Sequence, residues 1–301
     1  MRIVGSFSHH VSPWVIGAVA GVAILAASEG PSSARPLQTT LRSDARKAVV
    51  YISDQIRSFV DVFDLSGTRI GRITADLSYP SGLFVDAEHN LWVANLGDRD
   101  VLKFKRGKAT PIGTYYSGNS NPTGVTMCPD GTLYVAAGYI AVFPRGHHHP
   151  TRMLTSQYGN ITSVTCDAAG NVFATATVFS PPGYVVEFAG GHEPDTLLPI
   201  NLENPNDVKI DAAGNLLVLD AVTPSTVGEY TEAGQPTGKS LSIGNVWVQI
   251  AILPPGNSVF GVDVSDSAGE LVSFPRGRLE QSYTDSGFAS TQPYGIAYDP
   301  G

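Results

Sequence analysis

Short apolar stretches alternate with polar residues along most of the chain, and they come in pairs joined by a polar turn. In one such pair, residues 80–85 and 91–95 flank the turn 86–90. Alternation with a period of two predicts strands, and turns rich in Asp, Gly and Asn favour tight hairpins. No long segment with helical periodicity follows residue 47. The pattern therefore predicts an all-β fold.

The strand–turn–strand pair recurs at nearly regular spacing. Copies begin at residues 80, 122, 161, 205 and 246, so successive starts differ by 42, 39, 44 and 41 residues. A strand-based period near 40 residues is typical of a β-propeller, in which each repeat forms one blade.

A sixth copy is divided between the two ends of the chain. Residues 293–299 supply its first strand, while residues 49–54, 58–64 and 68–74 read as its second, third and fourth strands. An open ring would leave two unpaired sheet edges, which are prone to aggregation. We therefore predict a six-bladed β-propeller over residues 47–301, closed by pairing of the C-terminal strand with the N-terminal strands.

The repeat resembles those of the NHL-repeat and SMP-30-like six-bladed propellers. The shared motif is Pro-x-Gly-Val, then Asp-x-x-Gly-Asn, then Leu-Tyr-Val, and it recurs through residues 47–301. The resemblance implies the fold. It implies little about activity, since propellers of this kind serve as enzymes, binding modules and scaffolds.

The N-terminal region has a different composition from the repeats. Arg2 precedes an apolar run over residues 11–27, and small residues follow it. This order is typical of a secretory signal, although an uncleaved membrane anchor would look similar. We expect residues 1–28 to be a signal peptide or anchor and residues 29–46 to be a linker. The propeller would then be secreted or periplasmic.

The charge balance bears on possible partners. The chain has 27 acidic and 19 basic residues, which gives a net charge of −8. Nucleic-acid binding needs a cationic face for the phosphates. No basic stripe is visible, so we expect a protein or small-molecule partner and no nucleic acid. A membrane would be contacted only through residues 11–27, if they are retained.

Two cysteines, Cys128 and Cys166, fall near the same end of adjacent predicted inner strands. Export would permit a disulfide between them. Two small buried thiols would fit the sequence equally well.

Polar residues gather at one predicted end of the central channel. In a propeller, the loops that lead into each blade and those that follow its second strand share one face. The candidate ligand-binding residues on this face are Asp54, Asn95, Asp220, Asp263, Asn206 and Asp207. Such oxygen-rich sets suit Ca²⁺ or Mg²⁺ at the channel mouth, or a hydroxyl-rich ligand, although Asp and Asn also form turns and caps. The Asp-x-x-Gly-Asn turns belong to the opposite face, where we expect a structural role.

A histidine tract, His147-His148-His149, resembles a metal-binding segment. Three consecutive histidines cannot all point at one ion from a strand. We expect an exposed loop.

Three functional hypotheses follow. The first is a ligand- or protein-binding or scaffold module, since the sequence shows neither Gly-x-Ser-x-Gly nor a cysteine with a plausible histidine base. The alternative is a metal-dependent hydrolase or lyase of the SMP-30/gluconolactonase-like or streptogramin-lyase-like type. Glu29-Gly30-Pro31 matches the start of the lactonase metal site but lies far from the first blade. The third is a cell-envelope sensor anchored by residues 11–27.

Overall fold

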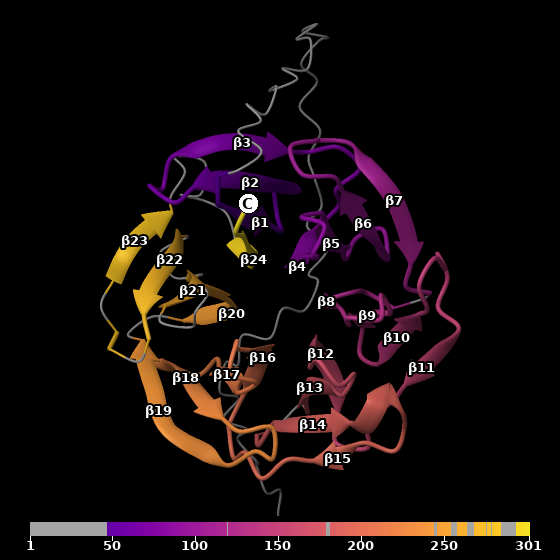
Figure 1. The fold of residues 1–301 in the computed structure, drawn as a ribbon, viewed down its shortest axis with the longest axis vertical. Coiled ribbons are helices and arrows are strands. Elements are labelled where there is room, and N and C mark those ends of the chain that lie inside the picture. Colours follow the sequence, from indigo (N-terminus) through magenta and orange to yellow (C-terminus); the bar gives the residue numbers. More distant parts are fainter. Residues whose placement is uncertain are drawn as a thin grey trace, which may run out of the picture. The chain divides into compact units, whose positions relative to one another are not determined.

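The computed structural model describes residues 47–118, 120–178, 181–243, 246–253, 258–263, 268–274, 276–277, 279–283 and 293–301. Their strands form six four-stranded antiparallel sheets, which are arranged as blades around a central channel (Figure 1). The prediction of a six-bladed β-propeller is thereby confirmed. The predicted signal or anchor and the linker lie outside the described residues. Within the described residues, no helix has the length and apolar character needed to cross a membrane.

Each blade has one strand next to the channel and three further strands outside it, named in that order below. Blade 1 holds β24 (Pro293–Asp299), β1 (Val49–Asp54), β2 (Phe59–Asp64) and β3 (Arg69–Ile73), and blade 2 holds β4 (Pro80–Val85), β5 (Leu91–Asn95), β6 (Asp100–Phe104) and β7 (Pro111–Tyr116). Blade 3 holds β8 (Gly124–Met127), β9 (Leu133–Ala136), β10 (Ile140–Phe143) and β11 (Arg152–Leu154), and blade 4 holds β12 (Asn160–Cys166), β13 (Val172–Thr177), β14 (Tyr184–Phe188) and β15 (Thr196–Leu197), with the short 3-10 helix η1 (Ala189–Gly191) after β14. Blade 5 holds β16 (Pro205–Ile210), β17 (Leu216–Asp220), β18 (Ser225–Tyr230) and β19 (Pro236–Ile243), and blade 6 holds β20 (Trp247–Leu253), β21 (Ser258–Asp263), β22 (Ala268–Ser273) and β23 (Leu279–Tyr283).

The ring is closed by the two ends of the described chain. β24 pairs antiparallel with β1, in a register that places Val49 opposite Asp299 and Asp54 opposite Pro293. The predicted pairing of residues 293–299 with residues 49–53 is confirmed. β24 and β1 lie side by side at the top of the ring in Figure 1.

A buried carboxylate ties this closure to blade 2. Asp299 is fully buried, and its Oδ1 lies 2.7 Å from His89 Nδ1. Its other carboxylate oxygen forms an ion pair with Arg106. Burial, followed by the charge of Asp299, raises the pKa of Tyr51 on β1 to about 12. The end of β24 therefore pairs with β1 inside blade 1 and contacts blade 2 through the side chain of Asp299.

The turn motif of the repeat has a direct physical role. The carboxylates of Asp167 and Asp211 accept hydrogen bonds from the backbone N–H groups of Asn171 and Asn215, at 2.7 and 2.8 Å. Gly170 takes a positive φ of 89°, which a glycine adopts without strain. The Asp-x-x-Gly-Asn pattern thus fixes the hairpin between the first two strands of a blade.

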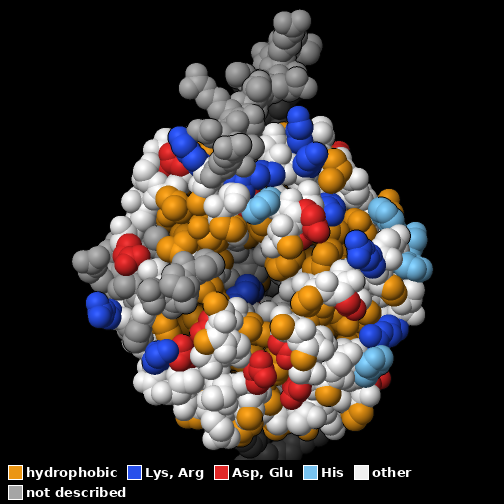
Figure 2. Space-filling view, in the orientation of Figure 1, with side chains coloured by type: hydrophobic (Ala, Val, Ile, Leu, Met, Phe, Trp, Pro, Cys, Tyr) orange, Lys and Arg blue, Asp and Glu red, His pale blue; other side chains and the backbone are white. Residues whose placement is uncertain are grey.

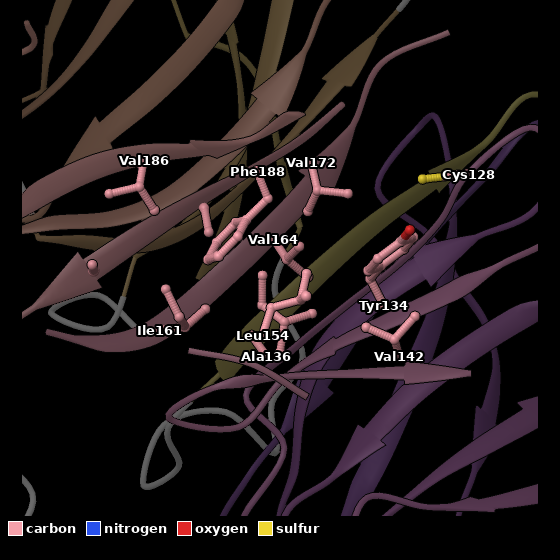
Figure 3. Close-up of a cluster of buried hydrophobic side chains, with 13 residues drawn as sticks. Cys128, Tyr134, Ala136, Val142, Leu154, Ile161, Val164, Val172, Val186 and Phe188 are labelled. Atoms are coloured by element: carbon pink, nitrogen blue, oxygen red, sulfur yellow. The ribbon is translucent and has the colours of Figure 1, made fainter. Parts of the chain in front are cut away.

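The hydrophobic core lies between neighbouring blades as well as within them. In the cluster of Figure 3, Tyr134 and Leu154 of blade 3 pack with Val164, Val172 and Phe188 of blade 4. Fully burying a Val, Leu or Phe side chain stabilises a fold by about 1.5–3 kcal/mol. Because neighbouring blades cover both faces of a blade, both faces of its strands carry apolar residues. The strands therefore appear in the sequence as almost continuous apolar runs.

Candidate functional site

The two ends of the channel differ in structure. The inner strands β4, β8, β12, β16, β20 and β24 begin at one face, which we call the start face, and end at the other, which we call the turn face. In blade 5, Pro205 pairs with Asp220 at the start face, and Ile210 pairs with Leu216 at the turn face. The predicted ligand-binding residues therefore belong to the start half of the channel.

Two of these residues, Asn95 and Asp220, form hydrogen bonds within their own blades. The Asn95 amide oxygen accepts a hydrogen bond from Ser78 N at 2.6 Å, and its Nδ2 donates to Asp100 Oδ1 at 2.9 Å. The Asp220 carboxylate accepts hydrogen bonds from the backbone N–H groups of Glu203 and Asn204, at 3.2 and 2.7 Å. Both side chains are buried, and each holds the loop that leads into its blade.

Asp207 connects three blades. Its side chain is 1% exposed and forms an ion pair with Lys209 Nζ at 2.5 Å within blade 5. It accepts hydrogen bonds from the Ser163 hydroxyl of blade 4 and, at 2.9 Å, from Ile250 N of blade 6. A buried carboxylate that accepts hydrogen bonds from this many donors orders the blades around it.

Similar hydrogen bonds cross all six blade junctions in the start half of the channel. In order from the junction of blades 1 and 2, they join Ser53 Oγ to Ser81 O, Ser81 Oγ to Thr123 O, Thr123 Oγ1 to Thr162 O, Ser163 Oγ to Asp207, Asn206 Nδ2 to Val248 O, and Ile296 N to Gln249 Oε1. We call this set the junction belt. Two of the residues that suggested a ligand site, Asn206 and Asp207, thus help to hold the ring together.

Asp54 differs from the other predicted residues. It is fully buried, and its Oδ1 accepts a hydrogen bond from Arg57 N at 2.9 Å, while its Oδ2 has no hydrogen-bond partner among the described residues. The side chain of Asp263 lies outside the described part of the structure. Ligand binding by this set stays a prediction. Within the described residues, no group of three or more His, Cys, Asp or Glu side chains could hold a metal ion.

A cavity of about 470 Å³ occupies the turn half of the channel, at the opposite end from the predicted site. Residues from all six inner strands line it in two complete rings, and Leu83, Val125, Val164 and Ile296 line it one residue further in than the deeper ring. The rim ring, which lies at the end of each inner strand or one residue before it, consists of Val85, Met127, Cys166, Ile210, Ile252 and Tyr298. The deep ring, one residue further in, consists of Phe84, Thr126, Thr165, Lys209, Ala251 and Ala297. The space-filling view shows a face hollowed at its centre, with hydrophobic side chains around the hollow (Figure 2).

Acidic side chains stand at one side of this cavity. Asp167, Asp211 and Glu232, which come from blades 4 and 5, are part of its lining. Burial and then the charges of Asp167 and Glu232 raise the pKa of the neighbouring Glu187. Figure 2 shows acidic side chains gathered below the hollow. The mouth is therefore negative on one side and apolar on the other.

A disulfide forms part of the cavity wall. Cys128 of blade 3 and Cys166 of blade 4 are joined, with their Cα atoms 5.5 Å apart, a normal separation for such a bridge. Cys166 belongs to the rim ring. The bridge therefore fixes the spacing of two inner strands where they enclose the cavity.

A second cavity, of about 550 Å³, lies between blades 2 and 3 next to the first. Phe84 and Met127 line both. His147 lines the second cavity, whereas the ring of His148 stacks on Tyr115 with centroids 4.4 Å apart and its Nδ1 lies 2.8 Å from Thr114 O. All three histidines of the tract are exposed. The tract forms an exposed loop, as predicted. The contacts of His148 with Tyr115 and Thr114 hold this loop against blade 2.

Comparisons with known proteins identify the fold and nothing finer. No family model matches the chain, and no curated protein matches it. The chain is similar to a propeller in the crystal structure of a nidogen/laminin complex, with a TM-score of 0.66 and 15% identity, covering 83% of this chain and 98% of that one. It is also similar to a functionally unknown protein of Desulfotomaculum acetoxidans (TM-score 0.59, 13% identity, covering 83% and 98%) and to Kuenenia stuttgartiensis hydrazine synthase (TM-score 0.55, 17% identity, covering 75% and 73%). Likeness at this level of identity shows a six-bladed β-propeller.

The polar members of the deep ring, Thr126, Thr165 and Lys209, are not among the site residues predicted from the sequence. One signal exists in blade 5, where Lys209 stands between Val208 and Ile210 in an inner strand that is otherwise apolar at this end. A charge at such a position must point into the channel or find a buried partner. Lys209 does both.

Proposed function

We propose that this protein is an exported binding module that takes its ligand in the turn-half cavity. The observation that carries the proposal is the cavity itself. It is closed on its sides by six inner strands, it is mainly apolar, and a few polar groups converge in it. Ligand sites commonly have this composition and volumes of about 300–1,000 Å³.

The junction belt in the start half of the channel supports the same choice. Ser81, Ser163, Asp207 and Gln249 are all buried there and belong to the junction belt. A ligand at that end would have to displace bonds that join the blades. A ligand in the turn half would not disturb them.

The nidogen propeller, which is similar in fold, comes from a complex with laminin. It provides a precedent for a propeller that acts by binding, although that partner is specific to that protein. We also propose, from the repeat motif, that the chain is related to the NHL and SMP-30-like propellers. A metal-dependent hydrolase or lyase is the less supported alternative, because the described residues assemble no metal site.

An uncharged apolar fluorophore tests the proposed site. N-phenylnaphthylamine should bind with increased fluorescence, because the rim ring offers a mainly apolar wall. Val85→Trp and Ile210→Trp, which fill the cavity from opposite blades, should each weaken binding by about tenfold or more. Fluorescence titration gives the dissociation constants.

The matched control is Val178→Trp, which makes the same change at an exposed valine outside this cavity. It should bind the probe like the unmodified protein. Equal binding by all four proteins would place the probe elsewhere and overturn the proposal, provided that circular dichroism shows each variant folded.

We further propose export, on the basis of the apolar run at residues 11–27. The mature protein should begin between Ala27 and Arg35, where small residues follow the run. N-terminal sequencing of the protein from the native host checks this. An intact Met1 on soluble protein would contradict secretion, and an intact Met1 in membranes would favour the anchored alternative.

A further inference from the structure

Three polar residues occupy consecutive places in the deep ring. Thr126, Thr165 and Lys209 come from blades 3, 4 and 5, each two residues before the turn of its inner strand. The remaining places on blades 6, 1 and 2 hold Ala251, Ala297 and Phe84. One half of the ring therefore offers hydrogen-bond donors, and the other half is apolar.

The two threonine hydroxyls have no partner in the described part of the protein. Thr126 is 5% exposed and Thr165 is 7% exposed, and both line the cavity. No hydrogen bond joins either hydroxyl to another residue of the described chain. Neither hydroxyl oxygen is among the fully buried side-chain atoms of the described chain that lack a hydrogen-bond partner, so both are open to the cavity. A molecule in the cavity would supply a partner.

Lys209 adds a positive charge and further hydrogen-bond donors to the deep ring. Its Nζ contacts Asp207 Oδ1 at 2.5 Å and lies 3.4 Å from Val208 O. An ammonium group carries three donors. Asp207 is stabilised in addition by Ser163 and Ile250 N, so it does not depend on the lysine alone. The ammonium can accept a further anionic partner on the cavity side.

The rest of the cavity limits what that partner can be. The rim ring is apolar apart from the sulfur of Cys166 and the hydroxyl of Tyr298, so a ligand that reaches the donors must pass apolar side chains. The carboxylates of Asp167, Asp211 and Glu232 at the same side repel anions, and this repulsion is smallest for a group with a single negative charge. A head group with a single negative charge fits both conditions.

We propose that the cavity binds a monocarboxylate with an apolar chain, and that Thr126, Thr165 and Lys209 hold the carboxylate. The apolar chain would run along Phe84 and the rim ring towards the turn face. This inference rests on the proposed function, because it names the ligand class of the same cavity.

The test uses three compounds with the same chain and different heads. Decanoate, decanol and decylamine compete with N-phenylnaphthylamine on the full-length protein at neutral pH. Decanoate should compete at least about tenfold better than decanol, since hydrogen bonds to a charged group are stronger than neutral ones. Decylamine should compete less well than decanoate, because its ammonium cannot accept a hydrogen bond from Lys209.

Substitutions of the three polar residues test whether they cause the preference for decanoate over decanol. Thr126→Val with Thr165→Val removes both hydroxyls at nearly constant volume and should reduce the advantage of decanoate over decanol by about three- to tenfold. Lys209→Met should abolish it. Thr162→Val, on the same strand as Thr165 but outside the cavity lining, is the control and should leave it unchanged.

The outcomes separate this inference from the proposed function. If the probe binds in the cavity but decanol competes as well as decanoate, or if the double threonine variant keeps the full preference, the carboxylate assignment is wrong and the cavity proposal stands. If the probe does not bind, calorimetric titration with decanoate shows whether the cavity binds a ligand at all. Absence of binding heat at several temperatures would then overturn both.

Discussion

A chain that lacks residues 293–301 is expected to lose its cooperative folding transition. The deletion removes β24, the innermost strand of blade 1, which pairs along its length with β1. It also removes Ile296, which is fully buried, and Asp299, the partner of Arg106. Removing one partner of a buried ion pair alone costs about 3–5 kcal/mol. The total loss should far exceed the ~1 kcal/mol of a typical point mutation.

Thermal unfolding followed by far-ultraviolet circular dichroism measures this effect. The control is a chain that lacks only residues 300–301, which lie beyond β24. It should melt within a few degrees of the full chain, because it keeps every strand pair. A 293–301 deletion that melts like this control would mean that the ring does not depend on the divided blade.

The Cys128–Cys166 bridge should stabilise the protein by about 4 kcal/mol. The two cysteines are 38 residues apart in sequence. Closing a loop of that length in the unfolded chain corresponds to roughly 4 kcal/mol in the chain-entropy model. Urea unfolding of the Cys128→Ser, Cys166→Ser double variant, followed by tryptophan fluorescence, gives the difference in free energy of unfolding.

Two further measurements check the bridge itself. The unmodified protein in reducing buffer should unfold at nearly the same urea concentration as the serine variant. Under non-reducing conditions, its mass should be lower by two hydrogens than that of the reduced form. Two thiols that react freely with iodoacetamide in the native, exported protein would show that the bridge does not form.

The fold could be predicted because every level of the sequence points to it. The Asp-x-x-Gly-Asn turns bond their own backbone, as Asp167 does with Asn171, so their spacing reports the hairpins directly. The divided blade was predictable for the same reason, since residues 293–299 end in half of a turn. Local chemistry and chain connectivity agree in this protein, which is the condition under which a sequence specifies one fold.

The site was harder to predict because residue type does not reveal the partner. Asn206 and Asp207 suggest a ligand site by type, yet they bond Val248 of blade 6, Ser163 of blade 4 and Ile250 of blade 6. Those partners are far from Asn206 and Asp207 in sequence and meet them only in the closed ring. Conversely, Thr126 and Thr165 look like ordinary strand residues. Their lack of a partner among the described residues is visible only in the three-dimensional structure.

The position of a bound bromine-labelled fatty acid tests the central claim, that the turn half of the channel is the ligand site. Crystals of the full chain soaked with an ω-bromo monocarboxylate would show the bromine by anomalous scattering. We predict bromine density near the rim ring and carboxylate density at Thr126, Thr165 and Lys209. Bromine density at the start face, near Asp54 and Asp220, or an empty turn-half cavity at saturating ligand, would contradict the account.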